Sequence, residues 1–211
     1  MPTIEENLKK WDSEYNWTMH GEEWSRYWGD SKKQWNAMIY PKIEKYLKNT
    51  WTILEIAPGY GRWTAYLTLF CKKFYGVDLS PSCVEFCKER FNDEMHEFYT
   101  NDGKSLEMIP DNSCDFVFSF DSLVHVEIDV LFMYLPQIYN KLKDGGTAFL
   151  HVSNLGGTTP LIEQPPHWRA RTTSGLVLVE FARAIGFSGE WELVDWCGVK
   201  DLDCFLTLRK N

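Results

Sequence analysis

From Trp51 onward the sequence alternates between short apolar runs and segments with helical periodicity, and this alternation constrains the fold more than any other feature. The runs are rich in β-branched and aromatic residues, which is typical of buried strands. Five such strands are expected before residue 154, at residues 51–56, 74–79, 96–101, 114–120 and 147–152. Alternating strands and helices predict a parallel sheet with helices on both faces.

Four helices are expected after residue 51. They lie at residues 62–71, after Ser80-Pro81, after Asp129 and at residues 174–185. Ser80 suits an N-cap, and Pro81 suits the first helical position because an N–H is not needed there. Pro136 predicts a kink in the third helix, and Gly145-Gly146 is expected to end it.

The last two expected strands, at residues 190–196 and 203–209, follow each other without a helix between them. They therefore predict an antiparallel hairpin at one edge of the sheet. The expected fold is α/β, with a doubly wound, mostly parallel sheet of seven strands and this C-terminal edge hairpin. Residues 153–173, which lack a clear period, are expected to be a functional or disordered loop.

The residues ahead of the sheet are expected to form two or more helices between Ile4 and Leu47. Aromatic residues recur there at helical spacing, at positions Trp24, Tyr27, Trp28 and Trp35. They predict either an aromatic face packed on the core or a lid over a ligand, and both can hold together. We expect a single domain over residues 1–211, with a helical cap at 1–48 and an α/β core at 49–211.

Composition narrows the possible partners. The net charge of −8, without a basic patch, disfavours nucleic acid. No apolar stretch is long enough to span a membrane, and the N-terminus lacks a secretory signal. The six cysteines form no C-x-x-C pair and lie mostly in apolar runs, so buried free thiols and a cytoplasmic location are expected.

Small and acidic residues occur where four of the expected strands end. In a doubly wound sheet, ligands bind beyond the carboxyl ends of the strands. The small residues of the turn from Glu55 to Gly61 would let backbone approach a ligand. Asp78 suits the two hydroxyls of a ribose, Asp102-Gly103 an adenine amino group, and Phe120-Asp121 the reacting centre.

Together these positions resemble a class I S-adenosylmethionine-dependent methyltransferase. The resemblance rests on residues 53–64 as the glycine-rich motif, 76–80 with the ribose acid, 101–103, 118–123 and the lead-in 142–146. It implies S-adenosylmethionine as cofactor and S-adenosylhomocysteine as product. The cofactor-binding residues that it implies are Glu55, Ala57, Gly59, Gly61, Trp63, Asp78, Leu79, Asp102, Gly103 and Phe120.

The glycine-rich motif of this sequence differs from the family pattern at one place. Ala57 stands where the family has its first glycine, and Pro58 follows it and removes an N–H donor. This affects the expected cofactor contacts more than the identity of the cofactor. A nicotinamide cofactor would need G-x-G-x-x-G, and Thr64 stands where the third glycine belongs.

A narrower resemblance suggests the acceptor. Residues 120–127, residues 151–155 and the aromatic leading helices are similar to methyltransferases of polysaccharide or lipopolysaccharide assembly. It implies O-methylation of a sugar or glycan-related acceptor. A neutral sugar hydroxyl would need a base, and the candidates are His125 and His151, with Asp121 one helical turn before His125.

The sequence also allows a metal site, an anion-binding site and other functions. Asp121, His125, His151 and Asn154 offer ligands for magnesium, although few carboxylates accompany them and a metal is not expected. Arg169 and Arg171 are candidates for binding an anionic acceptor, and His167 for an acceptor contact. The alternatives are a small-molecule N- or carboxyl-methyltransferase of secondary metabolism and a cofactor-binding protein without catalysis. The oligomeric state is left open.

Overall fold

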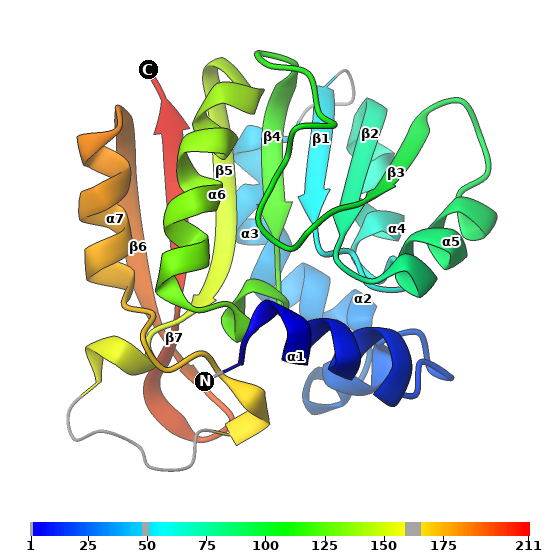
Figure 1. Cartoon of the computed structure of the whole chain (residues 1–211), viewed down its shortest axis with the longest axis horizontal. Helices are drawn as coiled ribbons and strands as arrows, with labels where there is room; N and C mark the ends of the chain where they lie inside the picture. Colours follow the sequence, from blue (N-terminus) through cyan, green and yellow to red (C-terminus); the bar gives the residue numbers. More distant parts are fainter. Residues whose placement is uncertain (1, 48–50, 159–165) are drawn as a thin grey trace.

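The structure is a computed structural model that describes residues 2–47, 51–158 and 166–211. Its strands form one seven-stranded sheet in the order β3-β2-β1-β4-β5-β7-β6 (Figure 1). The strands are β1 (Trp51–Ile56), β2 (Cys71–Asp78), β3 (His96–Thr100), β4 (Cys114–Ser119), β5 (Leu142–Ser153), β6 (Phe187–Trp196) and β7 (Val199–Lys210). The first five strands pair in parallel, and β7 runs antiparallel to both β5 and β6. The predicted fold class is confirmed.

The strand order places a switch point between β1 and β4. The chain moves outward from β1 to β3, and then returns to the other side of β1 to continue outward through β4 and β5. The connections therefore diverge at the carboxyl ends of β1 and β4 and leave a crevice there, which is where ligands bind in such sheets.

Two hydrophobic cores lie on opposite faces of the sheet. The helices α6 (Ile128–Lys141) and α7 (Gly175–Ala184) cover one face. The other face is covered by α4 (Thr64–Leu67), α5 (Pro81–Arg90) and the N-terminal helices. Strand β4 shows why both faces are apolar, because Val117 belongs to the first core and its neighbours Phe116 and Phe118 to the second.

The N-terminal segment forms a series of short helical turns. They are α1 (Ile4–Leu8), the π-helical turn η1 (Lys9–Glu14), the 3₁₀ turn η2 (Glu22–Trp28), α2 (Ser31–Gln34), the π-helical turn η3 (Trp35–Ile39), α3 (Tyr40–Ile43) and the 3₁₀ turn η4 (Glu44–Tyr46). The prediction of one aromatic face is wrong for Tyr27, which is 94% exposed, whereas Trp35 is buried. Gly29, with φ +98°, ends η2, so Tyr27 and Trp35 belong to separate helical turns.

Most predicted elements are present, with some shifted boundaries. Strand β2 begins at Cys71, so the preceding helix is shorter than predicted, with α4 followed by the 3₁₀ turn η5 (Thr68–Phe70). Helix α6 begins at Ile128, with Glu127 as its N-cap, slightly before the predicted start after Asp129, and it continues through Pro136. The helix ends at Lys141, so Gly145-Gly146 lies inside β5 and does not end the helix as predicted.

The loop predicted at residues 153–173 contains two short turns in its described parts, η7 (Leu155–Gly157) and η8 (Pro166–Trp168). Residues 159–165 lie outside the described residues. Within the described chain, no helix has the length and apolar character required to cross a membrane.

Candidate functional site

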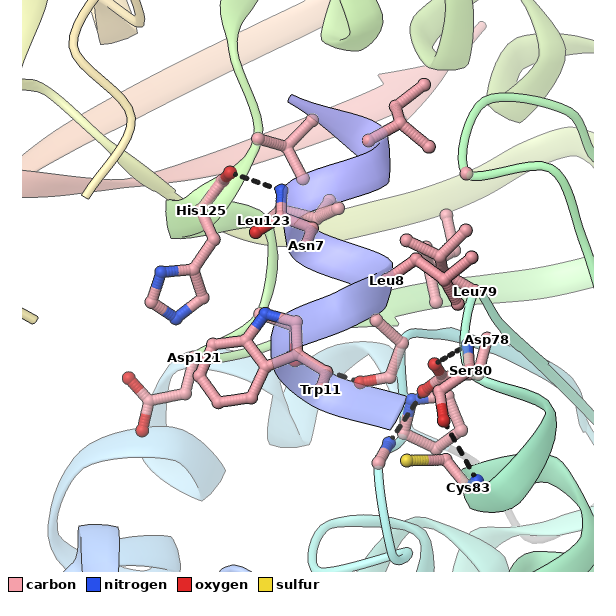
Figure 2. A pocket seen from close by; sticks show the side chains of 18 of the residues that line it. Asn7, Leu8, Trp11, Asp78, Leu79, Ser80, Cys83, Asp121, Leu123 and His125 are labelled. Atoms are coloured by element: carbon pink, nitrogen blue, oxygen red, sulfur yellow. Dashed lines mark hydrogen bonds between the residues drawn. The ribbon is translucent and has the colours of Figure 1, made fainter. Parts of the chain in front are cut away.

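A cavity of about 610 Å³ lies at the switch point, where β1, β2 and β4 end and the N-terminal segment crosses them. Figure 2 shows the helix that carries Asn7, Leu8 and Trp11 between His125 on one side and Asp78–Ser80 on the other. A volume of this size is typical of small-molecule sites. The predicted site residues that line it are Ala57, Gly59, Trp63, Asp78, Leu79, Gly103, Phe120, Asp121 and His125.

The turn after β1 has the backbone shape of a glycine-rich loop. Ala57 adopts a left-handed conformation with φ +59°, and its N–H donates to the carbonyl of Val77 at 2.7 Å. Alanine thus takes the conformation that glycine usually provides, at a cost of about 1–2 kcal/mol. Gly59 is also left-handed, with φ +57°, and a Cβ there would lie 2.9 Å from the ring of Trp17. The loop is therefore covered directly by the N-terminal segment.

Asp78 ends β2 at the cavity. Its two carboxylate oxygens accept hydrogen bonds from the N–H groups of Gly59 and Ser80, each at 2.9 Å. Burial raises the pKa of Asp78 to about 6, although the backbone N–H groups oppose this shift. Each oxygen has a further lone pair, so the carboxylate could accept hydrogen bonds from a diol in the cavity.

Three predicted cofactor residues lie outside the cavity lining. Glu55 is buried behind the turn and accepts a hydrogen bond from the Thr64 hydroxyl, and burial raises its pKa to about 8. Gly61 packs against Phe91, whose ring would lie 2.5 Å from a Cβ at this position. Asp102 accepts hydrogen bonds from the N–H groups that follow it, while its neighbour Asn101 lines the cavity. These three residues therefore contact other parts of the chain and not the cavity.

Asp121 lies at the cavity with an ion pair to Arg62. The Arg62 Nη2 donates to Asp121 at 2.9 Å, and Arg62 also contacts Ser25 at 3.0 Å and the face of Trp63. Burial acts to raise the pKa of Asp121, but the positive charges of Arg62 and Arg169 and the hydrogen bond from Arg62 outweigh it and lower the pKa. Asp121 is therefore charged at neutral pH, but its lowered pKa and its ion pair with Arg62 make it a weak base.

His125 presents one free nitrogen to the cavity. Its Nδ1 lies 2.9 Å from the carbonyl oxygen of Trp168, and because a carbonyl only accepts, Nδ1 carries the proton. Residues 2–47, 51–158 and 166–211 supply no hydrogen-bond partner for Nε2. Burial, assisted by the charge of Arg169, lowers the pKa of His125 to about 4, so the imidazole is neutral at pH 7. Its Nε2 can accept a proton.

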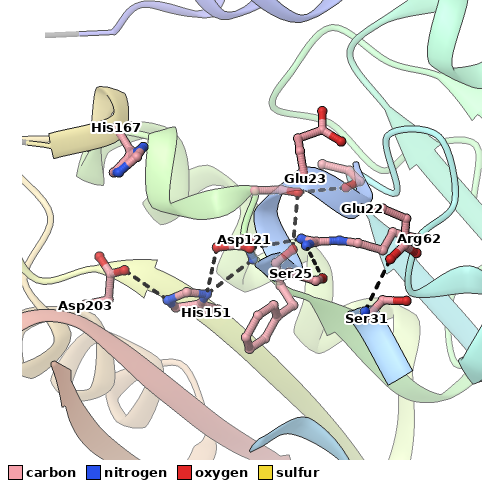
Figure 3. Close-up of polar contacts among 12 residues, drawn as sticks. Glu22, Glu23, Ser25, Ser31, Arg62, Asp121, His151, His167 and Asp203 are labelled. Carbon is pink, nitrogen blue, oxygen red and sulfur yellow. Dashed lines mark hydrogen bonds and ion pairs between the residues drawn. The ribbon is translucent and has the colours of Figure 1, made fainter. Parts of the chain in front are cut away.

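His151 has a different environment. It is fully buried in β5 and is not among the residues that line the cavity. The Asp121 N–H donates to His151 Nδ1 at 3.2 Å, and the Nε2–H donates to Asp203, also at 3.2 Å (Figure 3). Both ring nitrogens are therefore engaged, and His151 connects Asp121 to Asp203 beneath the cavity floor.

The N-terminal segment supplies site residues that sequence reasoning missed. The Asn7 amide donates to the carbonyl oxygen of His125 at 2.9 Å, and the Trp11 ring centroid lies 5.0 Å from that of His125. Asp12 accepts hydrogen bonds from the Ser80 hydroxyl at 2.7 Å and the Ser82 N–H at 3.0 Å. The aromatic residues at helical spacing are a signal for this region, but not for Asn7 or Asp12.

The candidate anion and metal ligands do not form a common site. Arg169 is buried and paired with Asp203, while His167 is exposed. Asn154 uses its side chain to bind the backbone of Asp201 and Gly175. Among the described residues, no group of three or more His, Cys, Asp or Glu could hold a metal ion.

Comparison with known proteins points to one family. Residues 54–150 match the methyltransferase domain family. No curated protein matches the sequence. The PH0226 protein of Pyrococcus horikoshii has a similar structure, with a TM-score of 0.66, 19% identity and coverage of 96% of each chain.

Two further solved structures are similar. Phosphoethanolamine N-methyltransferase 2 of Haemonchus contortus, in complex with phosphomonomethylethanolamine and S-adenosylhomocysteine, has a TM-score of 0.72 and 17% identity over all of this chain and 61% of that one. A putative S-adenosylmethionine-dependent methyltransferase of Listeria monocytogenes has a TM-score of 0.63 and 14% identity, over 82% of this chain and 97% of that one. Residues 54–150 thus match a methyltransferase domain, and the three solved structures share the fold of this chain.

Proposed function

We propose that this protein transfers the methyl group of S-adenosylmethionine to a small acceptor held in the switch-point cavity, with His125 as the base. One observation carries the proposal. The same cavity has a glycine-rich turn and Asp78 at one end, and at the other a neutral histidine whose Nε2 has no partner in the described chain.

The residues around the turn fit the cofactor. Asp78 would accept hydrogen bonds from the ribose hydroxyls, and the backbone at Ala57 and Gly59 allows close approach. Leu79 and Gly103 line the part of the cavity next to Asp78, where an adenine would lie. When bound, the cofactor supplies a methyl group that is already activated by its sulfonium, so the protein mainly aligns the acceptor with it.

His125 would remove the proton of a hydroxyl acceptor. As the bond from the acceptor oxygen to the methyl carbon forms, the sulfur–carbon bond breaks, and the acceptor proton passes to Nε2 of His125. Because Nδ1 already donates to the carbonyl of Trp168, this oxygen would stabilise the imidazolium that forms. Asp121 adds a negative charge in the same cavity.

A sugar hydroxyl is the acceptor we favour. Tryptophan rings and carboxylates, the groups that stack on sugar rings and accept from their hydroxyls, line the cavity together at Trp11, Trp24, Glu5 and Asp121. Among the described lining residues Arg62 is the single Lys or Arg, and it is paired with Asp121. An uncharged acceptor is therefore better suited to this cavity than a phosphorylated one.

An amine is the second candidate. The charged Asp121 and the faces of Trp11 and Trp24 would attract an ammonium group. The Haemonchus contortus relative binds an amine acceptor, although that molecule also carries a phosphate. A neutral amine needs no strong base, so an amine would make His125 less important.

A cytoplasmic location is likewise a proposal, which the six free cysteines support.

The first experiment is isothermal calorimetry of the full chain with S-adenosylmethionine and S-adenosylhomocysteine. We expect one-to-one binding of both, and a more than fivefold weaker affinity (about 1 kcal/mol) for Asp78→Asn, because a charge-assisted acceptor is lost. Asp93→Asn, at an exposed position, serves as the control. Absence of binding to either ligand would overturn the proposal.

Methyl-transfer assays with sugars and with primary amines then assign the acceptor. Turnover of sugars that falls on substitution of His125 supports the favoured reaction. Turnover of amines that is insensitive to this substitution supports the second candidate. Cofactor binding without transfer to either class would favour a non-catalytic cofactor-binding protein.

A further inference from the structure

We propose that Arg169 and Asp203 are positioning residues for His125. They hold the carbonyl group of Trp168 against Nδ1, and so keep the imidazole in the tautomer whose Nε2 lone pair is free for the cavity. The consequence for catalysis rests on the proposed function of His125, whereas the effect on its tautomer does not.

The pair of Arg169 and Asp203 is a rigid anchor. Nε of Arg169 donates to one oxygen of Asp203 at 3.0 Å, and Nη2 donates to the other at 2.8 Å. The side chains are 3% and 0% exposed, so water competes little with this two-point contact. Asp203 lies in β7 and also accepts from His151, which ties the anchor to the sheet.

Arg169 directly follows Trp168, so the anchor restrains the peptide group that faces His125. His167 and Trp168 have φ angles of +54° and +59°, which are unfavourable for residues other than glycine. Such a conformation persists only where the surroundings enforce it. The direction of the Trp168 carbonyl therefore depends on what holds the residues next to it.

Further contacts join this segment to the chain on either side of His125. The Ala170 N–H donates to the Val124 carbonyl at 2.9 Å. The Arg171 and Thr172 N–H groups donate to the Glu127 carboxylate at 3.1 and 2.8 Å. These contacts position the segment, but all lie after Arg169, so they leave the peptide of Trp168 to the anchor.

The positive charge of Arg169 also helps to keep His125 neutral. Arg169 is the nearby cation that disfavours protonation of His125, while Asp121 after β4 and Asp203 in β7 favour it. Glu5 in the N-terminal helix, Glu127 and Asp129 line the same cavity and add negative charge. Loss of the Arg169 charge would therefore raise the pKa of His125 from about 4.

The test is ¹⁵N NMR of protein labelled at histidine, with the full chain and its Arg169→Met variant. In the native chain we expect His125 in the Nδ1–H form. In the variant we expect a mixture of both neutral tautomers and a higher pKa. The acid limb of the kcat/KM profile should move to higher pH, and kcat should fall about tenfold, while the affinity for S-adenosylhomocysteine changes less than twofold.

Two further variants make the result decisive. Trp168→Ala keeps the backbone carbonyl and removes a half-exposed side chain, so it should retain the Nδ1–H form. If Arg169→Met does not fold, because Asp203 is left buried without its partner, Arg169→Met/Asp203→Asn removes both charges and keeps an acceptor for His151.

A folded variant in which His125 keeps both its tautomer and its pKa would overturn the inference. Its failure is separable from that of the proposed function. If substitution of His125 leaves methyl transfer unchanged, the role as a base is wrong, but the tautomer measurement still decides whether Arg169 and Asp203 position the ring.

Discussion

Two buried carboxyl groups next to the glycine-rich turn have similar chemistry but different roles. Glu55 and Asp78 both have a raised pKa, to about 8 and about 6, because burial penalises their charged forms. Asp78 lines the cavity, whereas Glu55 faces Thr64 behind the turn. Their pKa shifts therefore have different consequences, for ligand binding at Asp78 and for stability at Glu55.

Glu55→Gln should remove the part of the pH dependence of the free energy of unfolding that comes from Glu55. The folded-state pKa of Glu55 lies above its ordinary value of 4.5, so its contribution is fully present below pH 4.5 and is lost as the pH rises through 8. The free energy of unfolding of the native chain should thus decrease from pH 5 to pH 8. At pH 8 the variant should be more stable by at least about 1.4 kcal/mol, the value of one pKa unit.

Urea unfolding at pH 5, 6.5 and 8 measures this difference, with the exposed Glu180→Gln as the control. Asp78 titrates in both chains, and its charge adds to the raised pKa of Glu55 in the native chain. Parallel stability profiles for the native chain and Glu55→Gln would contradict the prediction.

His125→Asn should slow methyl transfer to a hydroxyl acceptor by about 100-fold or more, because the group that accepts the proton is lost. The Asn amide could still donate to the Trp168 carbonyl, so the loop should remain in place. Single-turnover rates at saturating cofactor measure the effect. His167→Asn is a matched control, since Asn tolerates the left-handed φ of +54° at that exposed position. An equal loss in both variants would argue against a base at His125.

At the scale of elements, the N-terminal helices and the glycine-rich turn act as one unit. The ring of Trp17 stacks on Tyr60 with centroids 4.7 Å apart, and Tyr60 stacks in turn on Phe86 of α5. Asp12 binds Ser80 and Ser82 at the start of the same helix. The glycine-rich turn is thus covered by a segment that is distant from it in sequence.

Gly59→Ala should weaken cofactor binding by displacing that segment. A methyl group at Gly59 would lie 2.9 Å from the Trp17 ring, so the ring must shift. The matched control is Gly198→Ala in the β6–β7 turn, which has a similar positive φ of +77° but no neighbour within 4 Å.

Both substitutions should lower the free energy of unfolding by about 1–2 kcal/mol through backbone strain. Only Gly59→Ala should weaken binding of S-adenosylhomocysteine in calorimetry, by about tenfold. Equal affinities in the two variants would show that the contact between Trp17 and the turn does not matter for binding.

On the scale of the whole molecule, two cores on opposite faces of one sheet bury most of the cysteines. All six cysteines are free; Cys197 is exposed in the β6–β7 turn and the other five are buried. The expectation of buried thiols is confirmed for those five and wrong for Cys197. Burial raises the pKa of the interior thiols, for example to about 11 for Cys114, and so suppresses their reactive thiolate form.

Thiol titration of the folded protein should therefore detect one rapidly reacting cysteine, Cys197, and all six should react in denaturant. Ellman's reagent followed by mass spectrometry identifies the site. The Cys197→Ser variant should show no fast phase. Rapid reaction of more than one thiol in the native chain would contradict the packing of the two cores.

Local patterns along the chain were sufficient for the sheet and for much of the cofactor end of the cavity. The strand β1, the Ser80-Pro81 start of α5 and the acid at the end of β2 all depend on residues close in sequence. Their signals are apolar runs, a cap and a strand end, and such features are set by short-range sterics and hydrogen bonding. The parallel sheet then follows from the alternation of strands and helices.

Contacts between distant segments decided the rest of the site. The sequence offers both His125 and His151 as candidate bases, but pairing of β5 with β7 encloses His151 between Asp121 and Asp203. His125 instead faces the cavity because Trp168, distant in sequence, engages its other nitrogen. A side chain's burial and its hydrogen-bond partners arise only when remote segments pack together, and no local pattern encodes them.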